Sequence, residues 1–193
     1  MTQAPARSAP AHKKRLSKPG RAIRMLAALF DPRAYLHVLR IVNYYNYTHV
    51  IPRRALQVGP GARISPNAAF SNPERIKIGA RFGLGARSTL WAGPATGMIE
   101  IGDDVLFGPD VLVTAAGYRF NDGSPVTEQA MDEASVHIGS DVWIGAKAII
   151  LPGVTIGNGA IIGAGALVRG PIPENAIAVG VPAKVVGLRT LAE

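Results

Sequence analysis

The sequence predicts an all-β solenoid, a parallel β-helix, preceded by a short α-helical segment. Branched aliphatic residues recur every six positions, at 138, 144, 150, 156, 162 and 168. A second small or branched residue lies four positions after each of the first five, and glycine directly follows the aliphatic in four of the five complete units. A period of six fits neither a helix nor a simple strand alternation. It is typical of parallel β-helices, whose sharp corners glycine can form.

The N-terminal part of the chain predicts a tail followed by helices. Residues 1–20 are rich in Ala, Pro, Ser, Lys and Arg, which predicts a basic disordered tail. Residues 21–30 form a basic amphipathic pattern, and a second helix can begin at Pro32. The helical segment 21–54 has two interpretations that stay open: it covers the open end of the solenoid, or it contacts an anionic membrane surface.

Weaker repeats extend the solenoid over residues 55–170. Val58, Ile64, Phe70 and Ile76 keep the period, which then resumes two residues out of phase from Ile78. Residues 114–137 are polar and turn-rich and lack the repeat, so we expect a loop that leaves the coils. Residues 171–193 contain prolines that end the regular pattern and form a C-terminal extension. Function is often carried by loops on a rigid scaffold.

Charge and composition exclude several classes of function. Residues 1–54 carry eleven basic side chains and one acidic, a net charge of +10, whereas the remainder carries ten basic and twelve acidic, a net charge of −2. A near-neutral solenoid argues against a nucleic-acid-binding surface on it. The absence of cysteine excludes disulfides and thiolate zinc sites. With no long apolar run and no secretory pattern, we expect a cytoplasmic protein, or one peripheral at the inner membrane face through residues 1–54.

The repeat region resembles a known family. The string DVWIG, LPGVTIG, IGAG and GVPAKVV is similar to the hexapeptide-repeat acyltransferases, in the maltose/galactoside, xenobiotic and polysaccharide O-acetyltransferase branch. The resemblance covers about residues 58–189. It implies a left-handed β-helix, a homotrimer, and acetyl-CoA as acyl donor bound between neighbouring solenoids. It also implies a saccharide as acceptor, and the basic amphipathic N-terminal segment would suit a lipid-linked saccharide.

The resemblance further implies which residues meet the donor. Trp143 is expected beside the pantetheine arm, with Gly145 in the same motif. The backbones of Ala146 and Ala164 are expected to hydrogen-bond the amides of the arm. Lys184 is expected near the nucleotide phosphates, with Arg169 next to the place where similar proteins often have a lysine. Each has a purely structural interpretation as well, since solenoid corners demand small residues.

The family's catalytic histidine is absent from the expected position. That position holds Tyr118, and an alternative upstream position holds Ala116. Three interpretations stay open: a transferase in which Tyr118 positions the acceptor and Asp122 or water removes the proton, a binding protein without chemistry, or a trimeric scaffold. A neutral tyrosine is a poor base, so an amine acceptor gains plausibility beside a hydroxyl. The repeat region has a single histidine, His137, so no histidine-based metal site is expected.

Overall fold

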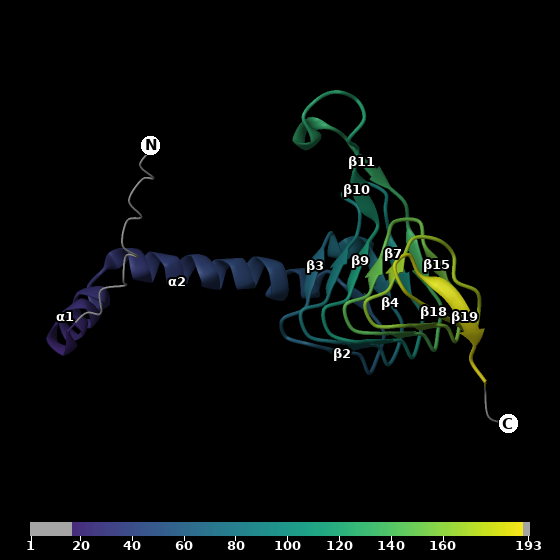
Figure 1. The fold of residues 1–193 in the computed structure, drawn as a ribbon, viewed down its shortest axis with the longest axis horizontal. Coiled ribbons are helices and arrows are strands. Elements are labelled where there is room, and N and C mark those ends of the chain that lie inside the picture. The colour runs from purple at the N-terminus through teal and green to yellow at the C-terminus, as the bar shows by residue number, and fades with distance from the viewer. Residues whose placement is uncertain (1–16, 191–193) are drawn as a thin grey trace, which may run out of the picture. The chain divides into compact units, whose positions relative to one another are not determined.

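The computed structural model describes residues 17–190 of the chain. These residues divide into two compact units, with the boundary after Asn43. The first unit is helical, and the second contains the solenoid (Figure 1).

Two α-helices make up the N-terminal unit and its continuation, α1 Lys18–Leu29 and α2 Pro32–Tyr45. The helical segment that the sequence predicts is therefore present. Helix α1 begins three residues earlier than expected, within the predicted tail, because the Ser17 side chain accepts a hydrogen bond from the Gly20 amide and Pro19 occupies the first turn. The rest of the predicted tail, residues 1–16, lies outside the described residues.

Short helical turns connect α2 to the first coil. A π-helical turn, η1 Asn46–Val50, is followed by the 3-10 turn η2 Pro52–Arg54. Both pack against β3, the first strand of its sheet, and Pro52 is buried there. The Arg53 guanidinium donates to the carbonyl of Ser65 in the first coil. The segment 46–54 therefore covers part of the N-terminal end of the solenoid.

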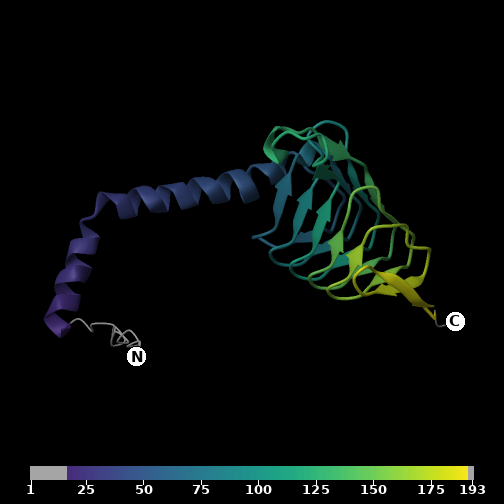
Figure 2. The ribbon, with the colours of Figure 1, turned by 45° about the horizontal axis from the view of Figure 1, so that its top comes forward.

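Three parallel sheets form the walls of the solenoid, and each coil adds one strand to each sheet (Figures 1 and 2). Sheet A consists of β1 Gln57–Val58, β4 Ile76–Ile78, β7 Ile99–Ile101, β12 Val136–Ile138 and β15 Thr155–Ile156. Sheet B consists of β2 Arg63–Ile64, β5 Gly83–Leu84, β8 Leu106–Phe107, β13 Trp143–Ile144, β16 Ile161–Ile162, β18 Ala176–Val179 and β19 Lys184–Leu188. Sheet C consists of β3 Ala69–Ser71, β6 Thr89–Trp91, β9 Leu112–Thr114, β14 Ile149–Ile150 and β17 Leu167–Val168.

The six-residue repeat fills the core as the sequence predicts. The aliphatic residues at 138, 144, 150, 156, 162 and 168 are each at most 3% exposed. Ile138 pairs with Ile156, Ile144 with Ile162, and Ile150 with Val168 on the neighbouring coil. Each pair is three repeats apart, so three repeats make one coil, and identical positions stack along the axis.

The two-residue change of phase after Phe70 has a local cause. Asn72 adopts a left-handed conformation with φ 54°, and the 3-10 turn η3 Pro73–Arg75 follows it. The chain then enters β4 with both Ile76 and Ile78 buried. The extra turn occupies the corner between sheets C and A, and the hexad pattern restarts from Ile78.

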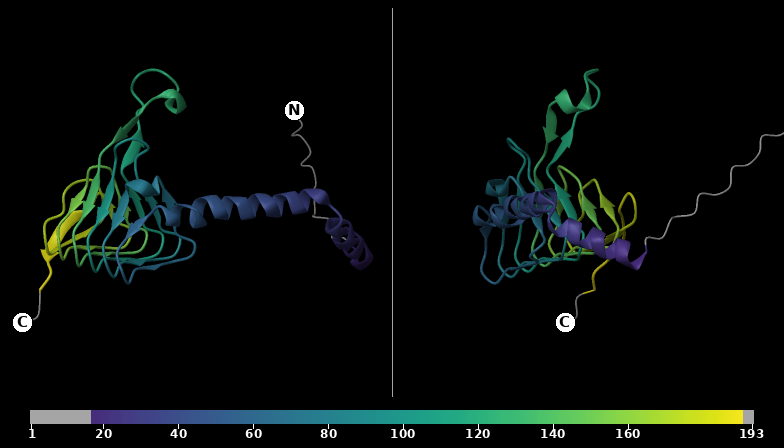
Figure 3. Two further views of the ribbon diagram at one scale, coloured as in Figure 1. Left: turned by 180° about the vertical axis from the view of Figure 1, so that it is seen from behind. Right: turned by 90° about the vertical axis from the view of Figure 1, so that its left-hand side faces the viewer.

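The excursion is more ordered and shorter than the loop predicted for residues 114–137. Thr114 ends β9, and residues 136 and 137 belong to β12, so only residues 115–135 leave the coils. They form an antiparallel hairpin of β10 Ala116–Tyr118 and β11 Met131–Glu133, with the 3-10 turn η4 Val126–Glu128 near its tip. Figure 3 shows this hairpin standing out from the solenoid.

The solenoid also continues beyond residue 170, where the sequence predicts an extension. Strand β18 pairs in parallel with β16, which adds a layer to sheet B. Ile172 forms a parallel bridge to Ile156, which adds a layer to sheet A. Strand β19 then turns back antiparallel to β18 (Figure 2). The prolines at 171 and 173 interrupt the hexad pattern without ending the stack.

Candidate functional site

An apolar row crosses the outer surface of sheet B. Leu106, Trp143 and Ile161 lie side by side on adjacent strands, and the Trp143 side chain is 53% exposed. Together with Asp104, Asp141 and Arg189 these residues line a shallow hollow. The Arg189 guanidinium lies 2.7 Å from an Asp141 carboxylate oxygen, so the hollow has an apolar floor and a charged rim.

The corner that follows Trp143 is built from small residues in close contact. A Cβ on Gly145 would lie 2.5 Å from the Ala164 nitrogen of the next coil. Gly145 is buried, so the structure gives it a packing role. The Gly165 amide donates to the Ala146 carbonyl over 2.8 Å, which stacks the two alanine corners on each other. Among residues 17–190, the amides of Ala146 and Ala164 have no hydrogen-bond partner, and Ala164 is exposed.

Two predicted cations lie at the C-terminal end of the solenoid. The Ala183 amide donates to the Leu167 carbonyl over 2.8 Å, which places the start of β19 beside β17. Lys184, the first residue of β19, is exposed, and so is Arg169, directly after β17. Within the described part of the chain neither side chain makes an ion pair, so both charges are available to a ligand.

Tyr118 lies at the base of the excursion hairpin, at the end of β10. Its side chain is 53% exposed. Its ring is tilted against the ring of Trp91, with 6.5 Å between the centroids. Trp91 is the last residue of β6, which pairs with β9 in sheet C. The Trp91 ring therefore contacts Tyr118 from the end of sheet C.

Asp122 is engaged within the tip of the same hairpin. Its carboxylate accepts hydrogen bonds from the Ser124 hydroxyl at 2.5 Å and the Ser124 amide at 2.9 Å. These bonds lower the pKa of the Asp122 carboxyl below its ordinary value. The side chain of Gln129, buried beneath, donates to the Ser124 carbonyl and completes the turn. A carboxylate held in this way is a weak proton acceptor near neutral pH.

The sequence gives no direct signal for Glu133, which fastens the hairpin to the solenoid. Its carboxylate accepts hydrogen bonds from the amides of Thr96 and Gly97, each at 2.6 Å, and from the Ala95 amide at 3.0 Å. These amides, Gly97 and Thr96 foremost, lower the pKa of Glu133. A Cβ on Gly93 would lie 2.2 Å from a carboxylate oxygen, so a side chain there would displace the carboxylate from these amides. In the sequence, only the presence of two glycines, Gly93 and Gly97, in the loop after Trp91 points to this contact.

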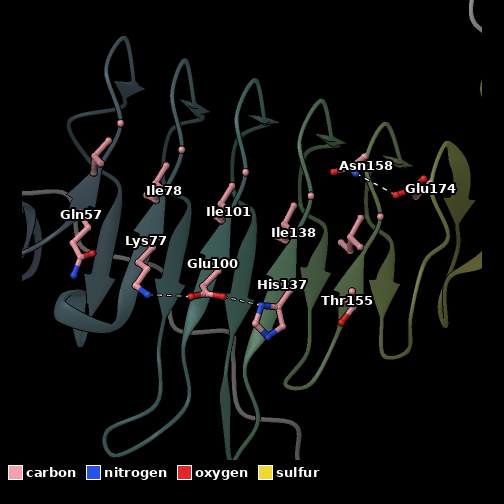
Figure 4. Close-up of a pocket in the computed structure, with 17 residues that line it drawn as sticks. Gln57, Lys77, Ile78, Glu100, Ile101, His137, Ile138, Thr155, Asn158 and Glu174 are labelled. Carbon is pink, nitrogen blue, oxygen red and sulfur yellow. Dashed lines mark hydrogen bonds and ion pairs between the residues drawn. The ribbon is translucent and has the colours of Figure 1, made fainter.

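A second, polar surface runs along sheet A (Figure 4). Glu100 bridges its two strand neighbours, with one carboxylate oxygen 3.3 Å from Lys77 Nζ and the other 3.0 Å from His137 Nδ1. The His137 side chain is half exposed here. Among residues 17–190, no three His, Asp or Glu side chains are grouped so as to hold a metal ion. None of the predicted donor-binding or catalytic residues lines this groove.

The predicted residues thus fall into three groups, of which Arg169 and Lys184 at the C-terminal end of the solenoid form one. Trp143, Ala146 and Ala164 share sheet B and the corner that follows it. Tyr118 and Asp122 belong to the hairpin that leaves the end of sheet C. The hollow beside Trp143 and the hollow of the hairpin, formed by residues 119–122 and Asp132, have no residue in common.

Comparison with known proteins gives this arrangement a family. The profile of the bacterial transferase hexapeptide family (six repeats) matches residues 135–170. A probable acetyltransferase of Mycobacterium tuberculosis is 33% identical over 162 residues, which is 74% of this chain and 53% of the relative. The galactoside O-acetyltransferase of Escherichia coli is 35% identical over 134 residues, which is 67% of this chain and 62% of the relative. The chain therefore spans between half and two thirds of the length of these curated relatives.

The solved structures agree with the sequence match. A galactoside acetyltransferase in complex with coenzyme A superposes with a TM-score of 0.67 and 30% identity, over 82% of each chain. This likeness confirms the fold class expected from the sequence resemblance, a left-handed parallel β-helix with an N-terminal helical segment. The shared repeats, the parallel coils and the extent of the match together assign the chain to the bacterial hexapeptide-repeat transferase family.

Proposed function

We propose that the protein is a CoA-dependent acyltransferase that acetylates a hydroxyl or amine of a saccharide in the biosynthesis of surface polysaccharides or other glycans. The observation that carries the proposal is the exposed Trp143 row, which leads to two stacked alanine corners with unpaired amides. Family membership and the CoA complex of a similar galactoside acetyltransferase support it.

The residues of sheet B fit an acyl donor of this kind. Trp143, Leu106 and Ile161 offer an apolar wall to the pantetheine arm, and the amides of Ala146 and Ala164 offer hydrogen-bond donors to its carbonyl groups. Arg169 and Lys184 offer positive charge to phosphates at the C-terminal end. When bound, acetyl-CoA supplies an activated thioester carbonyl. Gly145 acts indirectly, because its lack of a side chain lets the alanine corner approach the previous coil.

Tyr118 is proposed to orient the acceptor. Its exposed hydroxyl is held at the base of the hairpin by the Trp91 ring and can hydrogen-bond an acceptor oxygen or nitrogen. A neutral amine already carries a lone pair for attack and needs less help from a base than a hydroxyl. We therefore propose an amine as the favoured acceptor. Its nitrogen would attack the thioester carbonyl, the C–S bond would break with release of CoA as a thiolate, and the proton lost by the nitrogen would reach the thiolate through water. Asp122 is a weaker candidate for the base than the sequence implies, because Ser124 lowers its pKa.

The outer faces of the sheets support a homotrimer. Sheet A presents Lys77, Glu100 and His137 outward, whereas sheets B and C present apolar rows. These rows are Leu106, Trp143 and Ile161 on sheet B, and Leu112, Ile149 and Leu167 on sheet C. Packing sheets B and C of three copies around a cyclic axis covers both rows and leaves sheet A in water.

The use of acetyl-CoA, a cytosolic metabolite, leads us to propose a cytoplasmic location.

A CoA-binding protein without transfer activity is the second candidate. Two points favour it: the resemblance places Tyr118 where the family has its histidine, and the Asp122 carboxylate is engaged by Ser124. His137, the remaining histidine of the repeat region, lies on sheet A in contact with Glu100.

Calorimetry and turnover separate the two candidates. Titration with acetyl-CoA should show binding that Trp143→Ala weakens about tenfold or more, since burial of an aromatic side chain contributes about 1.5–3 kcal/mol. Phe120→Ala, at another exposed aromatic, which lies on the hairpin, is the control and should leave binding unchanged. Release of free thiol that depends on an added sugar or amino sugar supports transfer. Binding without such release across a broad acceptor panel supports the second candidate, and no binding at millimolar donor refutes both.

A further inference from the structure

Helix α1 has an apolar face opposite its basic side chains. Ile23, Leu26, Leu29 and Phe30 recur at helical spacing and are each more than half exposed. Arg24 lies on the opposite side of the helix, as the 100° step between residues requires. In the described part of this unit, α1 has no buried residue.

Helix α2 repeats the same design with a wider apolar face. Tyr35, Val38, Leu39 and Val42 follow one another at three- and four-residue steps and are each more than half exposed. Arg33 and Arg40, seven residues apart, share the other face with His37. Two consecutive amphipathic helices with exposed apolar faces are a larger apolar surface than a monomeric soluble protein ordinarily leaves in water.

Part of the covering role that the sequence suggests for residues 21–54 is filled by the last nine of them. The turns η1 and η2, residues 46–54, belong to the solenoid unit and pack on β3. Pro52 is buried there, and Arg53 contacts the first coil. The first strand of sheet C thus has a cover in residues 46–54, and within their own unit the apolar faces of α1 and α2 are exposed.

Charge indicates the nature of a partner for these faces. Residues 18–45 contain five basic side chains and one acidic, Asp31, whose carboxylate accepts from the Arg33 amide at the start of α2. A second copy of the same helices would bring like charges together, which is unfavourable. An anionic lipid surface attracts the basic side chains and accepts the apolar ones. No helix among the described residues is long and apolar enough to cross a membrane, which agrees with helices that lie in the interface.

We infer that α1 and α2 bind the surface of an anionic lipid bilayer, with their apolar faces among the acyl chains and their arginines at the headgroup phosphates. This inference stands on the helices alone. If the proposed transferase activity also holds, membrane binding brings the enzyme to saccharide acceptors carried on lipids.

Vesicle flotation of the full-length protein tests the inference. The probes are vesicles of phosphatidylcholine alone and of phosphatidylcholine with about one third phosphatidylglycerol. We expect flotation with the anionic vesicles and little with the neutral ones. Raising the salt to about 1 M shortens the screening length from about 10 to about 3 Å and should release most of the protein.

Point variants separate the contribution of the basic side chains to membrane binding from that of the apolar side chains. The double variant Arg33→Gln with Arg40→Gln should weaken partitioning to anionic vesicles about 30-fold, at about 1 kcal/mol for each basic residue near the surface. Leu39→Gln with Val42→Gln should weaken it at least about tenfold. Asn43→Gln, a polar exchange on the same helix, is the matched control and should not change partitioning. Circular dichroism verifies that each variant keeps its helices.

Three results would overturn the inference. The first is no flotation of the wild-type protein with anionic vesicles at low salt. The second is a change of oligomeric state in Leu39→Gln with Val42→Gln while vesicle binding stays unchanged, which would assign the apolar face to a second copy. The third is binding to polyglutamate without binding to vesicles, which would assign the charge to an acidic polypeptide. Thiol release with a water-soluble acceptor is measured on the same samples, so loss of membrane binding and loss of transfer are told apart.

Discussion

Replacement of Gly145 by alanine tests whether this glycine serves packing or ligand binding. The added methyl group would lie 2.5 Å from the Ala164 nitrogen, 2.9 Å from the Ala164 Cα and 2.9 Å from the Gly163 carbonyl carbon. All three atoms are backbone atoms of the next coil. That coil is held by hydrogen bonds on both sides of the corner, from the Gly145 amide to the Ile162 carbonyl before it and from the Ile149 amide to the Ala166 carbonyl after it.

The size of the effect follows from this contact. Non-bonded heavy atoms prefer about 3.5–4.0 Å, so the two coils would have to separate locally by about 1 Å. Overpacking costs about 1–3 kcal/mol, and the upper end applies because backbone cannot rotate away as a side chain can. For a chain of this length, about 3 kcal/mol lowers Tm by roughly 6–12 °C.

Gly170→Ala provides the matched control, since a Cβ there meets no atom within 4 Å. A tolerated Gly→Ala exchange stabilises by about 0.4–1 kcal/mol through the unfolded chain. Thermal unfolding of both variants, followed by far-ultraviolet circular dichroism in the absence of ligand, gives the comparison. If Gly145→Ala melts within a degree or two of Gly170→Ala, the packing account of Gly145 is wrong, and a ligand-specific role becomes the better explanation.

Three further predictions concern the hairpin and the core. Glu133→Gln should accelerate hydrogen exchange of the amides at 95–97 at neutral pH, because the charged acceptor is lost. In the wild-type protein the pKa of Glu133 is lowered, so its contribution is present above the unfolded-state pKa and is lost as pH falls through the folded-state pKa. The protection of these amides, measured against their intrinsic exchange rate at each pH, should therefore fall on acidification, and Glu133→Gln should not show that dependence. Tyr118→Phe should lower kcat for acceptor transfer without changing donor affinity. Unchanged turnover would show that the Tyr118 hydroxyl takes no part in the mechanism. Tyr118→His should raise the rate with hydroxyl acceptors. Ile150→Ala should lower the free energy of unfolding by about 2–5 kcal/mol in chemical denaturation, because Ile150 is fully buried; a loss below about 1 kcal/mol would contradict the stacked core.

The inward-facing half of the structure could be predicted from the sequence. Stacking of identical positions requires the same residue type at every turn, so the repeat from Ile138 to Val168 is visible without a structure. The break at Asn72 is visible as a two-residue slip, although its cause, a left-handed residue followed by η3, is not. The sequence pattern places the end of the solenoid too early, at residue 170. Strand β18 continues the stack through Ala176 and Ala178, but the prolines that flank it interrupt the six-residue period.

The site could be predicted only where it coincides with a motif. Trp143 and the alanine corners follow from the repeat string, but their neighbours do not. Arg189 meets Asp141 across 48 residues, and Glu133 meets Thr96 across 37. Contacts of this kind depend on how the hairpin and the C-terminal strand fold back. Neither segment follows the six-residue period, so no local sequence pattern predicts these contacts.

The outward-facing positions of the repeat carry the information that the inward positions lack. Every coil needs an apolar residue inside, so the core alone cannot distinguish one face of the triangle from another. Outside, the row on sheet A pairs Lys77 with Glu100 and Glu100 with His137, whereas the row on sheet B places Trp143 between Leu106 and Ile161. A charged row and an apolar row on the same scaffold have opposite preferences for water. We therefore propose that the apolar row with the unpaired alanine amides contacts a partner copy and holds the donor between the copies.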